Sequence, residues 1–236
     1  MQFTKAMIRT FCIAAALLVA NINVAAESSR APRTFGTSGQ PLRYVVLGDS
    51  TAAGVGADYE AGIAVGTARE LGQRHVVTMN NFAVSGARMD DVLRLQLPAA
   101  EALRPDVVLL SAGANDVTHL TRIGKMQDAL QAIVQRLRAA NPAVKIVVTG
   151  SPDMGSPPRV PWLLRGLASC RTKQVNRMFE REVAQSNLVF APIATRTGPL
   201  FRRDRTLFHP DRFHPNERGY ATWIPVLNEA LAKAIS

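Results

Sequence analysis

The fold class follows from residues 44–54, which read YVVLGDSTAAG. The first four residues are apolar without interruption, which is typical of a strand buried on both faces of a parallel sheet. They are followed by Gly48, Asp49 and Ser50, and then by further small residues up to Gly54. The stretch therefore predicts a buried strand that presents a serine hydroxyl immediately beyond its carboxyl end.

Four further strands are predicted from short apolar or β-branched runs, which follow one another at intervals of about 30 to 40 residues with helix-patterned sequence between them. These runs are Val76–Met79, Val107–Leu110, Lys145–Thr149 and Leu188–Phe190. Alternation of this kind favours βα units. We therefore expect one α/β domain over residues 42–236, with five parallel strands and helices on both faces of the sheet.

Three helices are predicted from the sequence between and after the strands. Apolar residues recur at three- and four-residue steps from Met126 to Leu137, and the pair Asn141-Pro142 ends that pattern. Residues 163–186 are also compatible with a helix. Residues 223–231 predict a last helix whose apolar side packs on the sheet.

Composition agrees with a single globular domain, since the chain has 236 residues of which 47% are hydrophobic. The net charge is +10, but the arginines are scattered and only residues 202–205 form a cluster, which a solvated face explains. We therefore predict no nucleic-acid partner. Two cysteines, Cys12 and Cys170, exclude a disulfide-rich scaffold, and Cys170 is expected to be a small buried residue.

The N-terminal segment has the pattern of a secretory signal peptide. Residues 1–26 contain two basic residues, an acid-free apolar stretch and a run of small residues that ends at Ala26. The uncharged run is short for a membrane span, so we expect cleavage and a secreted or periplasmic protein without a membrane span, and an uncleaved anchor is the alternative. Residues 27–41 are polar and rich in Ser, Gly and Pro, and they predict a flexible, exposed leader.

Ligands of parallel α/β sheets bind beyond the carboxyl ends of the strands, and polar residues follow three of the predicted strand ends. Ser50 follows the first, Gly86 lies after the second, and Asn115 follows the third. A glycine N–H and an asparagine amide can donate hydrogen bonds to the oxyanion of an acyl-transfer intermediate. A nucleotide site is not expected, because the dinucleotide-binding fingerprint would need glycine at Tyr59.

A late loop, HPDRFHPN at residues 209–216, supplies the remaining groups. Asp211 and His214 are three residues apart, so the carboxylate can orient one ring nitrogen while the other faces a serine hydroxyl. His209 is interpreted as a partly exposed loop residue, and His75 and His119 as structural. No cluster of histidines has the spacing of a metal site, and we predict no metal and no cofactor.

In combination, Gly48-Asp49-Ser50, Gly86, Gly113-x-Asn115-Asp116 and Asp211-x-x-His214 resemble the four sequence blocks of the SGNH hydrolases, the GDSL-type esterase and lipase family. The resemblance covers residues 43–236 and implies a flavodoxin-like, three-layer α/β/α fold. It also implies Ser50 as nucleophile, His214 as general base and then acid, and Asp211 as its orienting carboxylate. The backbone N–H groups of Ser50 and Gly86 and the Asn115 amide would form the oxyanion hole.

These roles predict a serine esterase that works through an acyl-enzyme. Asp49 and Asp116 are expected to hold loops by accepting backbone hydrogen bonds. Residues 151–164 are expected to form one wall of the acyl pocket, and a lipid, a thioester and an acetylated sugar all stay open as substrates. The alternative function is a catalytically silent protein of the same fold that binds carbohydrate or an anionic surface. The sequence carries no signature of an oligomeric state.

Overall fold

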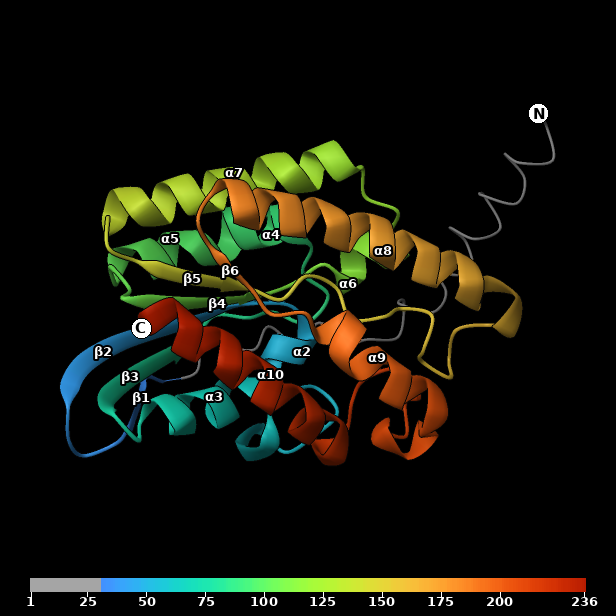
Figure 1. The fold of residues 1–236 in the computed structure, drawn as a ribbon, viewed down its shortest axis with the longest axis horizontal. Helices are drawn as coiled ribbons and strands as arrows, with labels where there is room; N and C mark the ends of the chain where they lie inside the picture. The colour runs from blue at the N-terminus through green and yellow to red at the C-terminus, as the bar shows by residue number, and fades with distance from the viewer. Residues whose placement is uncertain (1–30) are drawn as a thin grey trace.

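The computed structural model describes residues 31–236, and the predicted signal peptide at residues 1–26 lies outside this range. A six-stranded sheet with the order β1-β3-β2-β4-β5-β6 forms the middle layer (Figure 1). All five predicted strands are confirmed, and they run parallel to one another. In chain order the strands are β1 (Arg33–Phe35), β2 (Gln40–Gly48), β3 (His75–Asn81), β4 (Val107–Ser111), β5 (Lys145–Val148) and β6 (Val189–Phe190).

Both faces of the sheet are buried, as the uninterrupted apolar run of β2 predicts. Val45 and Leu47 pack into one hydrophobic core, and the alternate residues Tyr44 and Val46 pack into a second. Because successive side chains of a strand point to opposite faces, one strand contributes to both cores. The result is the predicted three-layer α/β/α architecture.

Two groups of helices cover these two faces (Figure 1). The first core is closed by α4 (Met89–Asp91), a π-helical turn (Val92–Gln96), α5 (Leu97–Ala102), α7 (Ile123–Ala140) and α8 (Trp162–Gln185). The second is closed by α3 (Ile63–Leu71), α9 (Ile193–Arg203) and α10 (Glu217–Ile235). The short helices α2 (Ser50–Ala53) and α6 (Ala114–Thr118) follow strand ends, and 3-10 turns occupy Tyr59–Ala61 and Arg205–Leu207. The three predicted helices correspond to α7, α8 and α10.

The sixth strand corrects two of the sequence predictions. Residues 33–35, expected to be part of a flexible leader, form β1 and pair antiparallel with β3, so the sheet has six strands instead of five. This strand has only three residues, which is too short for any periodicity to reveal. Its hydrogen bonds come from the edge of β3, and Arg33 forms an ion pair with Glu60. Over its described part, residues 31–41, the predicted leader lies on the surface and includes β1 and the first residues of β2.

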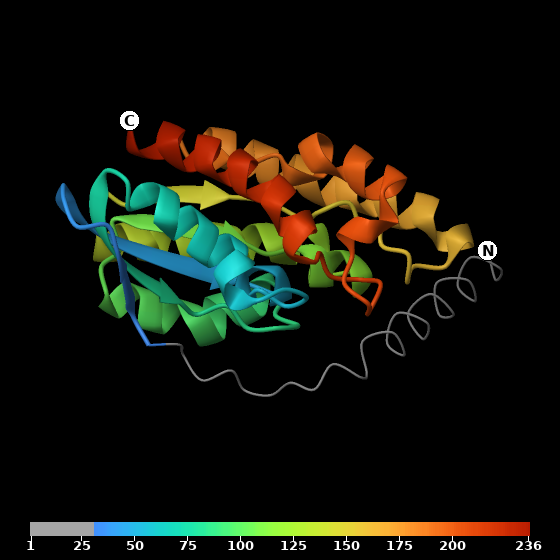
Figure 2. The ribbon, with the colours of Figure 1, turned by 90° about the horizontal axis from the view of Figure 1, so that it is seen from below.

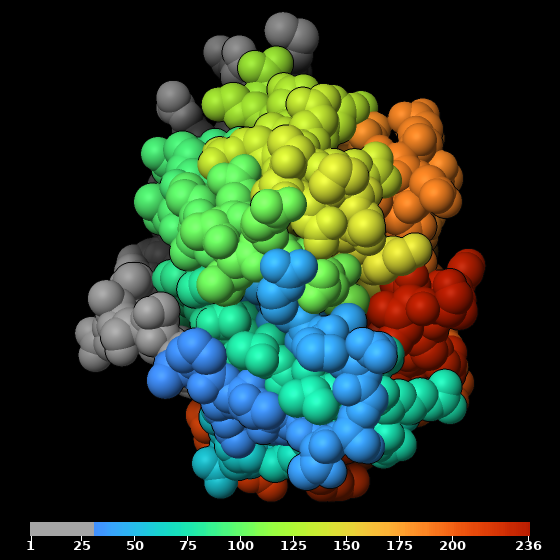
Figure 3. All heavy atoms as spheres, turned by 90° about the vertical axis from the view of Figure 1, so that its left-hand side faces the viewer, coloured from blue at the N-terminus to red at the C-terminus, as the bar shows by residue number. Residues whose placement is uncertain are grey.

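An ion pair lies at the amino ends of the parallel strands, and the polar residues of the candidate site lie at their carboxyl ends. At the amino edge, the Arg43 guanidinium pairs with the Asp106 carboxylate at 2.7 Å and ties the start of β2 to the segment before β4. Figure 3 shows this end of the molecule, with the start of β2 beside that segment and the end of α10. The carboxyl edge lies at the opposite end and carries the polar residues singled out in the sequence.

Among residues 31–236, no helix combines the length and the apolar character needed to cross a bilayer. Cys170 corrects a further prediction, because it is exposed on α8 instead of buried. A lone cysteine carries no positional signal, and only the packing of α8 decides which of its faces points to solvent.

Candidate active site

Ser50 is the first residue of α2, immediately after β2. The turn requires glycine at position 48, where φ is +152° and a Cβ would lie 2.0 Å from the Ser111 carbonyl oxygen. Gln96 fixes the same residue from the π-helical turn: its amide accepts from the Gly48 N–H at 2.9 Å and donates to the Gly48 carbonyl at 2.8 Å. The Ser50 hydroxyl therefore projects from a backbone that is held on both sides.

Gln96 was not predicted from the sequence, and neither was Asn81, whose amide donates to the Ala52 carbonyl at 2.9 Å. Both side chains are buried, and both hold the backbone that carries Ser50. A glutamine next to a helix and an asparagine at a strand end are common, so neither residue gives a local signal of this role.

Asp49 caps α2, as predicted for a loop-holding carboxylate. Its Oδ1 atom accepts from the Thr51 N–H at 3.0 Å and from the Thr51 hydroxyl at 2.8 Å. Burial raises the pKa of Asp49 to about 6, although the hydrogen bonds from Thr51 oppose that rise. Asp116 plays the corresponding part in the next loop, where it accepts from the Met89 N–H at 3.0 Å.

The raised pKa of Asp49 predicts how the free energy of unfolding depends on pH. The folded protein holds a proton on Asp49 up to about pH 6, whereas the unfolded chain releases it near pH 4. The protonated Asp49 side chain therefore makes its full contribution to the free energy of unfolding below pH 4. This contribution, on the order of 3 kcal/mol, is lost as the pH rises through 6. Asp49→Asn keeps the acceptor oxygen for Thr51 and removes the titration.

We expect the free energy of unfolding, measured with urea at pH 4, 5, 6 and 7, to fall with rising pH in the unaltered protein more than in Asp49→Asn. The variant should therefore become more stable relative to the unaltered protein as the pH rises. Other groups titrate equally in both proteins, so the difference isolates Asp49. Two curves that stay parallel across this range would contradict the raised pKa.

His214 and Asp211 come from the loop between the 3-10 turn at Arg205–Leu207 and α10. His214 Nε2 lies 2.9 Å from Ser50 Oγ, and His214 Nδ1 lies 2.6 Å from Asp211 Oδ2. The histidine is 4% exposed, so water has little access to its ring. Since an ionised carboxylate only accepts hydrogen bonds, Nδ1 carries the proton and Nε2 is free to accept from the serine hydroxyl.

The second oxygen of Asp211 holds the loop itself. Asp211 Oδ1 accepts from the backbone N–H groups of Phe213 and His214 at 2.9 and 3.0 Å. Burial favours the neutral acid, but the hydrogen bonds from His214 and from these two N–H groups outweigh it, and the pKa of Asp211 lies well below its usual value. The carboxylate is therefore ionised throughout the range in which histidine titrates.

His209 is half-exposed, as predicted, and its Nδ1 atom lies 3.5 Å from Asp211 Oδ2. That separation is longer than a hydrogen bond, whereas His214 reaches the same oxygen at 2.6 Å. The histidine that lies against Ser50 is therefore His214.

The predicted oxyanion-hole residues follow neighbouring strand ends. Gly48 and Ser111 are paired across β2 and β4, so the chain leaves both strands at one level and leads to Ser50 and Asn115. One N–H of the Asn115 amide donates to the Ala87 carbonyl at 3.1 Å, which leaves the second N–H for another acceptor. Gly86 precedes this carbonyl and has a φ of +83°.

A pocket connects these groups. It is lined by Ser50, Asn115 and His214 and by the apolar side chains of Met154, Phe201, Phe208, Phe213 and Trp223. The expected wall, residues 151–164, contributes Pro152, Asp153, Met154, Ser156 and Pro157. The prediction is wrong for the last residues of this wall, because Trp162 and Leu163 begin α8 and face solvent. Gly86 lies outside the lining residues.

A serine, a histidine and an aspartate joined by hydrogen bonds at the carboxyl edge of an α/β/α sheet define the geometry of a serine hydrolase. The model of the GDSL-like lipase/acylhydrolase family matches residues 46–222, and the chain belongs to this family. A GDSL-like esterase of Mycobacterium tuberculosis is 31% identical over 202 residues, which cover 83% of this chain. The same match covers 63% of that longer protein.

Solved structures share the fold. TesA has a TM-score of 0.66 and 20% identity, with 81% of this chain and 99% of TesA covered. An extracellular lipase from Streptomyces rimosus has a TM-score of 0.60 and 24% identity, with 80% and 99% covered. A family 3 carbohydrate esterase from Clostridium thermocellum has a TM-score of 0.64 and 17% identity, with 82% and 96% covered. These likenesses show the fold, which a lipase and a carbohydrate esterase share.

Proposed function

We propose that the protein is a secreted serine esterase that hydrolyses carboxylic esters through an acyl-enzyme intermediate. The observation that carries this proposal is the hydrogen-bonded chain from Ser50 Oγ through the His214 ring to Asp211, with lengths of 2.9 and 2.6 Å. In this arrangement His214 Nε2 takes the proton of the Ser50 hydroxyl, and Oγ attacks the carbonyl carbon of the ester.

The remaining steps use the same groups. The tetrahedral intermediate collapses when His214 returns the proton to the departing alcohol, which leaves an acyl group on Ser50. His214 then takes a proton from water, and the resulting hydroxide oxygen attacks the acyl carbon. The second tetrahedral intermediate collapses when the bond between Ser50 Oγ and the acyl carbon breaks, and His214 returns the proton to Oγ as the acid is released. Asp211 stays ionised throughout and stabilises the imidazolium that forms in each step.

The oxyanion of this intermediate would receive hydrogen bonds from the backbone N–H groups of Ser50 and Gly86 and from the Asn115 amide. The Ser50 N–H suits this task because the first residues of a helix have no acceptor within the helix. The place of Asn115 in the pocket beside Ser50 and His214 supports its assignment, and the resemblance of the block around Gly86 to the family supports that of Gly86.

Replacing Asn115 by alanine tests the oxyanion hole. We expect kcat to fall by about 10²–10³-fold, because the amide donates to charge that is present only in the transition state. Steady-state kinetics on one soluble ester separates kcat from KM. A change confined to KM would instead mean that Asn115 binds substrate in its ground state.

The lining of the pocket supports an apolar acyl group of small or medium size. Four aromatic side chains and Met154 line the pocket that Ser50 also lines. Binding energy for the acyl group would come from removing its apolar surface from water. A lipid, a thioester and an acetylated sugar can all present such a group.

The proposal of secretion rests on the basic, apolar and small-residue pattern of residues 1–26. The function itself is tested with the purified protein and p-nitrophenyl esters from acetate to palmitate. We expect short and medium chains to be hydrolysed faster than palmitate. Failure on every chain length and on acetylated glycans would favour the alternative, a silent binding protein of the same fold.

A further inference from the structure

The outward face of the first turns of α8 is apolar. Trp162, Leu163 and Leu167 are 76%, 71% and 50% exposed, and together we name them the α8 tip. Single exposed apolar residues are ordinary, but three large ones within two helical turns are a patch of the kind that marks a binding surface.

No polar side chain interrupts this face. At 3.6 residues per turn the three residues of the α8 tip fall within a sector of about 140°. The other two exposed residues of these turns, Gly166 and Cys170, lie inside the same sector and are apolar or small. The buried side of these turns is held by Ala168, which packs in the first core.

The α8 tip lies at the end of the molecule that carries the candidate active site. Because α8 runs antiparallel to the strands, it begins at their carboxyl edge, and its first turns project past the sheet (Figure 1, Figure 2). The loop that leads into α8 lines the pocket through Pro152, Met154 and Pro157.

Hydrogen bonds fix the α8 tip relative to this loop. The Arg165 guanidinium donates from Nε to the Val160 carbonyl at 3.1 Å. The Ser169 hydroxyl donates to Asp153, a residue of the pocket wall, at 2.8 Å. A surface that binds the α8 tip would therefore lie at a fixed position relative to the pocket.

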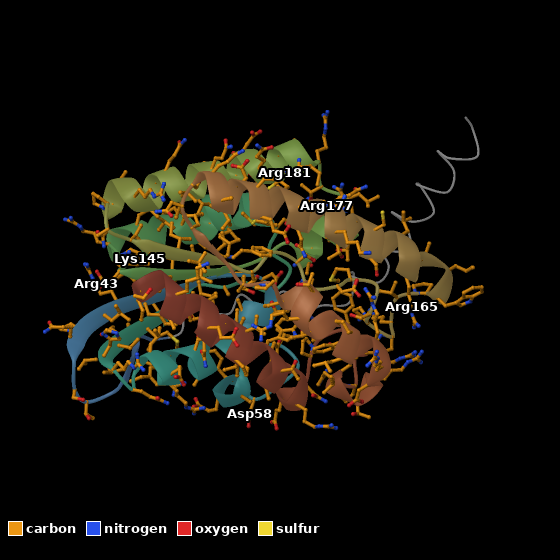
Figure 4. All side chains as sticks on the ribbon, in the orientation of Figure 1. Arg43, Asp58, Lys145, Arg165, Arg177 and Arg181 are labelled. Atoms are coloured by element: carbon orange, nitrogen blue, oxygen red, sulfur yellow. The ribbon has the colours of Figure 1, made fainter. Side chains whose placement is uncertain are left out.

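Further along the same face, the helix becomes cationic. Lys173, Arg177 and Arg181 are exposed and follow the sector of the α8 tip at four-residue steps, and Figure 4 shows Arg177 and Arg181 on α8. Glu180 is the one exposed acid of this helix, because Glu182 is buried and accepts hydrogen bonds from Gln127 and Gln131. The distance along the axis from Leu167 to Lys173 is about 9 Å.

We propose that the α8 tip and its cations dock on a lipid surface that carries anionic headgroups. If α8 meets the surface with its N-terminal end, the α8 tip lies about 5–10 Å deep at the boundary of headgroups and acyl chains. Lys173, about 9 Å further along the axis, then lies at the level of the phosphates. Tryptophan suits this boundary because it has an apolar body and a polar N–H. Docking turns the end of the molecule that holds the pocket toward the lipid.

The test uses fluorescence of the purified Ser50→Ala protein with vesicles, so the result does not depend on catalysis. The chain has two tryptophans, and because Trp223 lines the pocket, the protein also carries Trp223→Phe, so that a shift in emission reports on Trp162 alone. We expect a blue shift and co-sedimentation with phosphatidylglycerol vesicles, and a much weaker response with phosphatidylcholine. A protein held on vesicles through another segment would give co-sedimentation without the shift, which would overturn the proposal.

Variants in the same background locate the contact. The double variant Leu163→Ser, Leu167→Ser should lower the partition coefficient by at least about tenfold, since each leucine buries several methylene equivalents. Lys173→Glu with Arg177→Glu should remove the preference for the anionic vesicles, because each cation contributes about fivefold near such a surface. Leu95→Ser is the matched control, because Leu95 is equally exposed but lies on the π-helical turn.

Thermal unfolding checks that each variant is folded. Equal partition of the leucine variant and the Leu95→Ser control would contradict the proposal. So would a protein that binds no vesicles but changes from dimer to monomer in sedimentation when the leucines are replaced, because the face would then belong to a second copy of the chain.

Discussion

Ser50→Ala is expected to abolish ester hydrolysis, with kcat lower by about 10⁶-fold. The variant removes the atom that attacks the ester, which lies 2.9 Å from His214 Nε2. The residual rate would come from the oxyanion donors and from binding alone. The measurement is the initial rate on p-nitrophenyl acetate over the full pH range.

The substitution should leave the fold unchanged, because Gly48, Gln96 and Asp49 hold the turn through backbone contacts that do not involve the Ser50 hydroxyl. Ser186→Ala, at the C-terminal end of α8, serves as the matched control for loss of a hydroxyl and should retain full activity. A folded Ser50→Ala protein that still hydrolyses esters would overturn the proposed mechanism.

Asp211→Asn is expected to lower kcat by about 10⁴-fold. The backbone N–H groups of Phe213 and His214 both donate to Oδ1, so the oxygen of the new amide will occupy that position. The amide nitrogen then faces His214 Nδ1, which must accept a hydrogen bond instead of donating one. This moves the ring proton to Nε2, where it blocks proton transfer from Ser50.

Kinetics as a function of pH separates this effect from a loss of structure. The variant should keep its loop contacts and its KM while kcat falls. His209→Ala is the control, because His209 lies beside the same carboxylate at 3.5 Å but does not reach Ser50, and it should change kcat little. A loss of only a few-fold in Asp211→Asn would mean that the carboxylate does not set the tautomer of His214.

Most of the sheet could be predicted because its strands follow a local rule. A run such as Tyr44–Leu47 is apolar throughout only if both faces of its strand are covered, and each of the five runs of this kind forms a parallel strand. β1 could not be predicted in this way, since three residues with one aromatic side chain carry no period and the pairing depends on a free edge of β3.

The candidate site divides in the same manner. Ser50 and Asn115 were singled out because polar residues at strand ends point to chemistry, and Asp211 and His214 because of their three-residue spacing in a loop. Ser50, Asn115 and His214 line one pocket, and Asp211 lies against His214. Gln96 was missed, because its contact with Gly48 joins residues 48 positions apart in the sequence. A bond of that kind is a property of the folded chain alone.

The sequence by itself thus determined the layers of the fold and the succession of strands and helices, and it pointed to the residues of the candidate site, because hydrophobic period and turn chemistry are local. Tertiary structure decided the hydrogen bonds from Gln96 that hold the Ser50 turn, the direction of the His214 ring and the exposure of Trp162 and Leu163 on α8. The cations of α8 show the same division, since arginines that are scattered in the sequence share a face only when a helix repeats every 3.6 residues. Contacts between distant segments, and the choice of which helical face meets solvent, arise only when the whole chain packs.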